Sequence, residues 1–443
     1  MKSNLITKSA HRLVTKSGAL LLLALVLVFQ VVAPRVVRAS IDDSVLVSTS
    51  TPEGRLAVFD DVWETIDERY YDSRFHGIDW QASRTTYRPA AAKANSAREL
   101  YEVIRKMISA LRDAHTRVYA PDEKFDWWNP RFITLGFTIR EVEGLPTVIQ
   151  VERDSEAARN GIRPGDVLTK IDDIPAKEFI TRKLQTPGLA SDASARFRAI
   201  ASVLEGPAGT SIKIDWQSKD GKTRSAAFTR FWNQRQLGFS SRRVDNLAII
   251  KIDAFTQSLA FEFMKALPGM VSNVEGIILD LRANGGGDAE AMADVVSPFL
   301  EDGTSLGKFV DRSGASFELH TYLKRPWVSA SAVQVPIVVL TSESTSSAAE
   351  IMASALQTKR GARVIGSDSC GCVLAIRSRH ALPDGGVLDV SEFDYRTSEG
   401  VRLEGLGVTP NETTTIKRKD LYAGRDGTLE LGKLLLKQLK RQP

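Results

Sequence analysis

Ser347 occupies a position in which a serine could do chemistry. The segment Pro336–Met352 reads as a buried strand, a hydroxyl-rich loop and the first turn of a helix. A serine at such a turn can act as a nucleophile, because the helix dipole and the backbone N–H of Ala348 can hold an oxyanion beside it. Ser347 and Glu350 also match a capping box, which would be a purely structural role. Both interpretations stay open at this point.

A glycine loop follows a second buried strand. The segment Gly276–Asp288 reads as a strand that runs into Gly285, Gly286 and Gly287 ahead of a helix. Consecutive glycines let backbone amides approach a ligand closely, which suits an oxyanion hole or a phosphate cradle. The phosphate interpretation lacks the lysine and hydroxyl of a P-loop, and no G-x-G-x-x-G pattern is present. A tight turn that needs glycine is the structural alternative.

Two further residues could complete a system for proton transfer. His115 is expected at the C-terminal end of the last helix of an N-terminal helical segment. There it could be a general base, or it could cap the last helix carbonyls. Glu404 lies in a glycine-rich turn and could orient such a base. An ion pair of Glu404 with Arg402 or Arg396 is an equally simple alternative.

The elements that must position these residues fall into successive segments. Apolar residues recur at helical spacing over residues 55–119, with Ser96 as a helix cap. Short β-branched segments with turns predict a mostly β module over 132–231. From Leu247 onward strands alternate with helices, which predicts an α/β core with its chemistry at the loops that leave the strands. A Lys-rich amphipathic helix over 428–439 is expected to be a solvated terminal helix.

The first 39 residues read as an export signal rather than as part of a fold. Basic residues precede an apolar run from Gly18 to Ala33, which is followed by the small-x-small pattern Val37-Arg38-Ala39. The mature chain is expected to start at Ser40, outside the cytoplasm. Because Arg38 and its basic neighbour Arg35 could slow cleavage, an uncleaved membrane anchor is the alternative.

Charge and cysteine content exclude several classes of function. Subtracting the six basic residues of the leader from the net charge of +5 leaves −1 for the rest of the chain. A nucleic-acid partner therefore has no electrostatic support. Cys370 and Cys372 are too few for a disulfide scaffold, and no histidine or cysteine pair has zinc-ligand spacing. Neither a metal nor a cofactor is expected, and a bridge between cysteines this close in the chain would be easily reduced.

Together and in this order, these segments resemble the tail-specific, or carboxyl-terminal processing, serine proteases, and more closely their tricorn-like branch. The resemblance runs from about residue 59 to 410, and its best motifs are Leu111–Thr116, Leu279–Gly287 and Ser347–Glu350. It implies an α/β protease domain with a crotonase-like ββα core, an N-terminal helical domain and an inserted, mostly β PDZ-like domain. Typical members use a Ser-Lys dyad, but Cys372 stands where the lysine is expected. Either the protein is inactive or another base serves.

The resemblance also identifies the β module. Thr134–Ile139 looks like a PDZ carboxylate-binding loop, with Leu135, Gly136 and Phe137 as its peptide-binding residues, and Ala157–Leu168 looks like the helix-to-strand segment of that domain. PDZ domains add a peptide strand to a sheet edge and bind its terminal carboxylate on backbone amides. This implies polypeptide substrates that are captured at exposed or unfolded C-termini.

The tricorn-like branch supplies the other base, since its enzymes pair the serine with a histidine of the helical domain and with a later glutamate. The resemblance thus implies Ser347 as nucleophile, His115 as base and Glu404 as its partner. The amides of Gly286 and Ala348 would bind the oxyanion. The chain departs from the tricorn pattern at Ala114, where the tricorn core has a serine.

The expected organisation is a signal peptide or anchor (1–39), a helical domain (52–125), a PDZ-like domain (132–231), a protease core (235–420) and a basic C-terminal helix (421–443). The expected function is a serine endopeptidase that acts on exported proteins, without a cofactor. Two other classes stay open. One is a degenerate, non-catalytic protein that binds peptides or apolar ligands, and the other is an enzyme with Cys372 as its nucleophile and His115 as its base.

Overall fold

The computed structural model describes residues 46–123, 131–184, 192–234, 237–322 and 333–439. The predicted leader therefore lies outside the described residues. In the part of the chain that is described, no helix combines the length and the hydropathy of a membrane span. The compact unit formed by the described residues begins at Val47.

The N-terminal helical segment is built from three helices, namely α1 (Pro52–Arg69), α2 (Trp80–Lys93) and α3 (Ala97–Ile108), with the short turns η1 (Phe75–Gly77) and η2 (Ser109–Leu111). Ser96 caps α3 as predicted, because its hydroxyl accepts the N–H of Glu99. The buried side of these helices packs against Leu388 and Val390, which come from the far end of the chain. There β1 (Arg117–Tyr119) pairs with β18 (Val387–Asp389), and β18 pairs with β17 (His380–Ala381).

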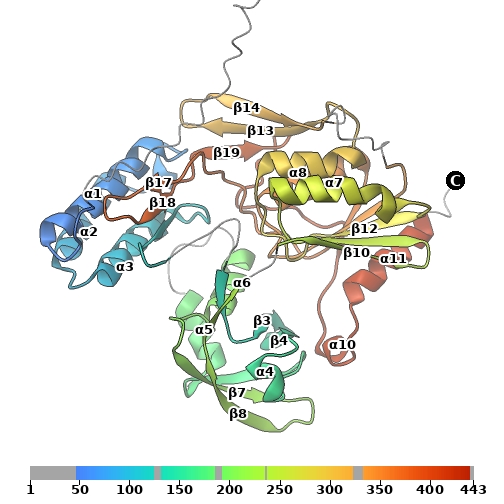
Figure 1. Cartoon of the computed structure of the whole chain (residues 1–443), viewed down its shortest axis with the longest axis horizontal. Helices are drawn as coiled ribbons and strands as arrows, with labels where there is room; N and C mark the ends of the chain where they lie inside the picture. Colours follow the sequence, from blue (N-terminus) through green and yellow to red (C-terminus); the bar gives the residue numbers. More distant parts are fainter. Residues whose placement is uncertain (1–45, 124–130, 185–191, 235–236, 323–332, 440–443) are drawn as a thin grey trace, which may run out of the picture. The chain divides into compact units, whose positions relative to one another are not determined.

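The next segment carries two antiparallel sheets. One has two strands, β2 (Arg131–Thr134) and β9 (Phe231–Gln234). The other has the strand order β3-β4-β5-β7-β8, with β6 (Ile174–Pro175) beside β5. Its strands are β3 (Phe137–Val142), β4 (Leu145–Val151), β5 (Val167–Ile171), β7 (Ser211–Gln217) and β8 (Thr223–Thr229). The helices of this segment are α4 (Glu156–Arg159), α5 (Ala176–Leu184) and α6 (Asp192–Ser202). In this sheet β3 is an end strand, and α6 lies beside it (Figure 1).

The α/β core is a sheet of six strands in the order β10-β11-β12-β15-β16-β20. Only the β10–β11 pair is antiparallel. The strands are β10 (Phe239–Val244), β11 (Leu247–Ile252), β12 (Gly276–Asp280), β15 (Ile337–Thr341), β16 (Arg363–Gly366) and β20 (Glu412–Thr413). The carboxyl ends of parallel strands meet at one edge, so the loops after β12, β15 and β16 are brought together there.

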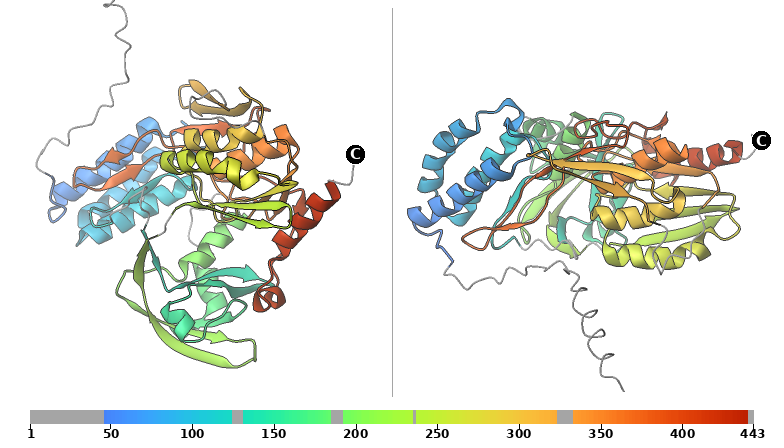
Figure 2. Two further views of the ribbon diagram at one scale, coloured as in Figure 1. Left: turned by 45° about the vertical axis from the view of Figure 1, so that its right-hand side comes forward. Right: turned by 90° about the horizontal axis from the view of Figure 1, so that it is seen from above.

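Both faces of this sheet are covered, which explains the continuous apolar runs in its strands. Ile277 and Leu279 of β12 pack with the helices α7 (Gln257–Val271), α8 (Ala289–Val296) and α9 (Ala348–Arg360). Ile278, which points to the opposite face, packs with α11 (Gly427–Leu439). Figures 1 and 2 show α7 and α8 on one side of the sheet and α11 on the other.

The prediction of a solvated terminal helix was wrong for α11. Its residues Leu429, Gly432 and Leu436 are buried, and a Cβ at Gly432 would lie 3.3 Å from Ile365 and 3.4 Å from Ile278. These three positions share one face of the helix, and that face covers the sheet, whereas Lys437 is exposed. The helix is therefore part of the core.

The remaining elements connect these segments. A three-stranded sheet has the order β14-β13-β19 and consists of β13 (Ser305–Asp311), β14 (Ser316–His320) and β19 (Phe393–Arg396). The turn η3 (Ser297–Phe299) follows α8, and the short helix α10 (Arg418–Tyr422) precedes α11.

Candidate active site

Ser347 ends the loop between β15 and α9 with an unusual backbone conformation. Its φ is 57° and its ψ is −126°, whereas an ordinary N-cap residue is extended. A non-glycine residue with positive φ at a sharp strand-to-helix turn is strained, and such turns present nucleophilic serines in other folds. Glu350 Oε2 accepts the N–H of Ser347 at 2.9 Å, which is the carboxylate half of the predicted capping box. The serine is thus held by its backbone at the start of a 13-residue helix.

The glycine loop after β12 lies directly against Ser347. A Cβ at Gly286, whose φ is +94°, would lie 2.6 Å from Ser347 Cβ and 2.8 Å from the carbonyl oxygen of Ser346. Only glycine permits this approach. The Gly286 N–H, which the sequence assigned to the oxyanion, donates to Asn284 Oδ1 at 2.8 Å. An oxyanion could use this amide only after Asn284 has released it.

Replacing Gly286 by alanine is expected to displace Ser347 and lower kcat by about 100-fold, because a shift of about 1 Å in a reacting group has an effect of that size. The matched control is Gly303→Ala. Gly303 also has a positive φ, +75°, but a Cβ there would meet no atom within 4 Å. The control should lose about 1 kcal/mol of stability from backbone strain alone and keep its kcat. Equal kcat values in steady-state assays of the two variants would contradict the prediction.

Glu350 is fully buried and joins Ser347 to the loop that contains both cysteines. Its Oε1 accepts the Ser369 hydroxyl at 2.6 Å and the Gly371 N–H at 2.7 Å, and its Oε2 also accepts the Cys372 N–H at 3.0 Å. Burial raises the pKa of Glu350 to about 7, while these hydrogen bonds act in the opposite direction. The sequence suggested Glu350 only as a helix cap. Its role in holding the cysteine loop was not visible, because its partners there come from a later segment of the chain.

Cys370 and Cys372 form a disulfide in this loop. The cysteine-nucleophile alternative is therefore wrong for this structure, because a disulfide sulfur has no thiol to ionise. The carbonyl oxygen of Cys372 accepts the Ser347 N–H at 2.9 Å. The disulfide thus lies beside Ser347 and offers no second nucleophile.

Glu404 is held by the same loop. Its Oε2 accepts the N–H of Val373 at 2.6 Å and that of Leu374 at 3.2 Å. The alternative of an ion pair with Arg402 or Arg396 is wrong, because both of these arginines pair with Asp394 at 2.9 Å. Burial raises the pKa of Glu404 to about 7, and the nearby charges of Asp113 and Glu350 add to the effect.

His115 lies beyond the helix end at which it was expected. The helix α3 stops at Ile108 and the turn η2 at Leu111, after which Arg112 adopts a left-handed conformation with φ 53°. Apolar periodicity continued through Leu111, which is why the sequence placed the helix end too late. The N–H of His115 donates to Asp113 Oδ1 at 2.8 Å. The neighbouring Ala114 packs in one buried cluster with Cys370 and Cys372.

Asp113 is a residue that the sequence reasoning missed. Its carboxylate accepts the N–H of His115, the N–H and hydroxyl of Thr116, and the hydroxyl of Ser391 at 2.9 Å. The Asp-x-x-Thr spacing was the available signal for this turn, since aspartate commonly accepts hydrogen bonds from the residues that follow it. Asp113 fixes the backbone that carries His115.

The predicted peptide-binding residues Leu135, Gly136 and Phe137 lie apart from Ser347 in the chain, at the turn from β2 into β3. Gly136 has φ +82°, and a Cβ there would lie 2.3 Å from Ser155 Cβ. Its N–H donates to the Thr134 hydroxyl at 2.9 Å. Leu135 and Phe137 are buried.

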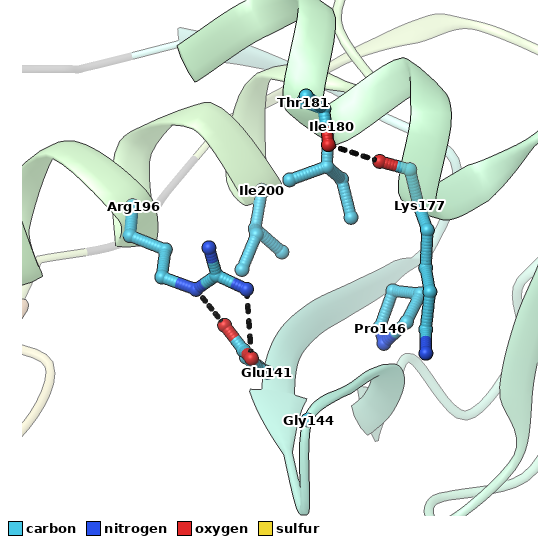
Figure 3. A pocket seen from close by; sticks show the side chains of 8 residues that line it. All are labelled: Glu141, Gly144, Pro146, Lys177, Ile180, Thr181, Arg196 and Ile200. Atoms are coloured by element: carbon cyan, nitrogen blue, oxygen red, sulfur yellow. Dashed lines mark hydrogen bonds and ion pairs between the residues drawn. The ribbon is translucent and has the colours of Figure 1, made fainter.

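A cavity of about 190 Å³ lies farther along the same sheet, where the β3–β4 turn faces α5 and α6 (Figure 3). Glu141 of β3 forms an ion pair with Arg196 of α6 on its rim. The other lining residues are Gly144, Pro146, Lys177, Ile180, Thr181 and Ile200.

Two stretches of the chain match known protein families. Residues 246–414 match peptidase family S41, and residues 52–109 match the tricorn protease C1 domain. The chain is 28% identical over 398 residues to the chloroplastic carboxyl-terminal-processing peptidase 2 of Arabidopsis thaliana, covering 83% of this chain and 71% of that protein. It is 26% identical over 386 residues to the carboxyl-terminal-processing protease of a Picosynechococcus species, covering 83% and 87%.

Solved structures show the same mixed α/β protease fold. Mature CPAF complexed with lactacystin has a TM-score of 0.66 at 15% identity, with 88% of this chain and 98% of that chain covered. The photosystem II D1 C-terminal processing protease has a TM-score of 0.51 at 22% identity, with 82% and 94% covered. On its family matches, its relatives and its fold, the chain belongs to the tail-specific, or carboxyl-terminal-processing, family of serine proteases.

Proposed function

We propose that this protein is a serine endopeptidase that cleaves peptide bonds with Ser347 as nucleophile, His115 as general base and Glu404 as the partner of His115. One observation carries the proposal. The loop 369–374 bonds to the Glu350 carboxylate, which holds Ser347, and to the Glu404 carboxylate, and its disulfide packs against the neighbour of His115. The three residues thus share one supporting loop although they lie far apart in the sequence.

The reaction would proceed through an acyl-enzyme. His115 takes the proton of the Ser347 hydroxyl while the Ser347 oxygen attacks the substrate carbonyl carbon. His115 then gives that proton to the departing amine. The N–H of Ala348, at the start of α9, stabilises the oxyanion together with the Gly286 N–H once Asn284 has released it. A water molecule, activated by the same histidine, then hydrolyses the ester.

For substrate capture we propose that residues 132–231 form a PDZ-like domain, which precedes the crotonase-like core in the chain. The position of β3 at the end of its sheet supports this role, because an end strand can pair with an added peptide strand. The turn at Leu135, Gly136 and Phe137 would receive the terminal carboxylate. Substrates would be exported proteins with exposed or unfolded C-termini, if the leader directs export as its sequence suggests.

A fluorophosphonate probe tests the enzyme against the binding-protein alternative. Labelling that mass spectrometry locates on Ser347 is the expected result, because only an activated serine reacts quickly with this class of reagent. A protein that binds C-terminal peptides by fluorescence anisotropy but takes no label would instead be the non-catalytic adaptor.

Activity is expected to increase with pH through about 7, the value to which burial raises the pKa of Glu404. The ionised carboxylate is the form that can stabilise a cationic His115, which itself must be neutral to act as a base. The contribution of Glu404 to stability changes in the opposite direction. Since the folded-state pKa lies above the unfolded value, this contribution is complete below the unfolded pKa and is lost as the pH rises through the folded one.

Profiles of kcat/KM against pH, together with urea unfolding on both sides of neutrality, measure the two effects. Glu404→Gln should remove the part of the pH dependence of the unfolding free energy that comes from Glu404. The pH dependence that comes from other groups should remain. A kcat/KM that stays constant from about pH 5.5 to 8 would contradict the assignment.

A further inference from the structure

We infer that the Cys370–Cys372 disulfide is a positioning element of the active site, so that peptidase activity requires the oxidised bridge. The inference rests on the proposed function. It concerns a feature that the catalytic scheme does not use, namely a disulfide between two cysteines that only Gly371 separates in the chain.

Every backbone N–H from Gly371 to Leu374 donates a hydrogen bond to a buried carboxylate. The N–H groups of Gly371 and Cys372 bond to Glu350, and those of Val373 and Leu374 bond to Glu404. Two successive amide pairs therefore face two different acids. A change in the backbone of this segment would move both carboxylates relative to each other.

Two carbonyl groups of the segment also accept hydrogen bonds. The oxygen of Cys372 accepts the Ser347 N–H at 2.9 Å, and that of Gly371 accepts the N–H of Gly405 at 2.8 Å. Gly371 has φ +66°, and a Cβ there would lie 3.1 Å from the backbone of Gly405, Leu406 and Gly407. The bridge thus closes around a residue that is pressed against the turn carrying Glu404.

The two cysteines pack against the segment that carries His115. Cys370, Cys372 and Ala114 form one buried cluster, and Ala114 precedes His115. Opening the bridge would replace one compact S–S unit by two separate thiols in the space that Ala114 shares. The loops of His115, Ser347 and Glu404 would then lose their common restraint.

The redox step is an ordinary thiol–disulfide exchange. A dithiol attacks Cys370 Sγ, which belongs to the more exposed cysteine (7%, against 1% for Cys372), and Cys372 leaves as a thiolate. The second thiol of the reagent then displaces Cys370. Two electrons and two protons pass from the dithiol, which becomes a disulfide, to the bridge, which becomes two thiols. Exchange with an oxidised disulfide carrier reverses the step.

The test is unusually clean because the chain contains only these two cysteines. The full-length protein is treated with dithiothreitol, two free thiols are counted with Ellman's reagent, and folding is checked by circular dichroism. We expect kcat and the rate of fluorophosphonate labelling to fall together by at least about tenfold, a modest part of the loss that misplaced catalytic groups can cause. KM should change less than about twofold, and reoxidation should restore kcat.

The double variant Cys370→Ala/Cys372→Ala is the matched control. It should have the low kcat of the reduced protein and should not respond to dithiothreitol. A folded wild-type protein with two titrated thiols and an undiminished kcat would overturn the inference. So would an unchanged kcat in the folded double variant.

Hydrogen exchange separates this inference from the proposed function. Reduction should accelerate exchange of the amides of Gly371, Cys372, Val373 and Leu374 by at least about tenfold, since their hydrogen bonds would open. If the oxidised protein neither cleaves peptides nor takes the probe, the proposed function fails, and this exchange rate alone decides whether the bridge positions the loop. Unchanged exchange after complete reduction would refute the positioning role.

Discussion

Ser347→Ala is expected to lower kcat for peptide cleavage by about 10⁴-fold or more, which is the size of effect seen when the nucleophile of a serine protease is removed. The reason is that, in the described part of this turn, Ser347 alone has a positive φ, and its Cβ lies directly against Gly286. Because the backbone amides and the substrate-binding segments are untouched, KM should change little. Steady-state kinetics on a C-terminal peptide substrate measure both constants.

The neighbouring hydroxyl provides the control for this substitution. Ser346 donates to the carbonyl oxygen of Gly285 at 3.0 Å and has no part in the proposed chemistry. Ser346→Ala should therefore retain kcat within a few-fold and keep fluorophosphonate labelling, while Ser347→Ala loses both. If Ser347→Ala cleaved peptides at the wild-type rate, another residue would be the nucleophile.

Glu350→Ala is expected to lower the free energy of unfolding by about 3 kcal/mol or more, because each buried donor left without an acceptor costs on the order of 1–3 kcal/mol. The Ser369 hydroxyl and the amides of Gly371 and Cys372 would lose their acceptor. The Ser347 N–H would keep the carbonyl oxygen of Cys372. Urea unfolding monitored by circular dichroism gives the change in free energy.

A second glutamate in the first turn of a core helix separates this effect from the loss of a helix-end charge. Glu290 occupies that position in α8 and is exposed. Glu290→Ala should change the free energy of unfolding by less than about 0.5 kcal/mol. Glu350→Gln should lie between the two, because its amide keeps one acceptor oxygen but turns an NH₂ toward the donors. If Glu350→Ala were as stable as Glu290→Ala, the hydrogen bonds of Glu350 would contribute little.

The parts of the fold that could be predicted were those set by local patterns. Alternating apolar runs and helices over the last two hundred residues indicated a sheet covered on both faces, and the glycine and serine loops were placed at strand ends. Ser96 was recognised as a cap because its partner, Glu99, is only three residues away. These signals depend on neighbours in the sequence.

The parts that could not be predicted depend on contacts between distant residues. Glu404 was predicted to orient His115 or, as the alternative, to pair with a nearby arginine, and neither prediction anticipated the amides of Val373 and Leu374 that bond to its carboxylate. The apolar face of α11 was visible in the sequence, yet nothing local showed that Ile278 and Ile365 would receive it. The sequence does not indicate which distant partner a backbone amide or a buried surface will contact.

The two carboxylates held by the loop after β16 also bear on how the chain matures. Ser347, Glu350 and the cysteines are synthesised before residue 404, so a chain that is still emerging has no acceptor for the amides of Val373 and Leu374. The proposed catalytic set would therefore be completed only after most of the polypeptide has been made. An unfinished chain would lack Glu404, which the proposed mechanism requires as the partner of His115.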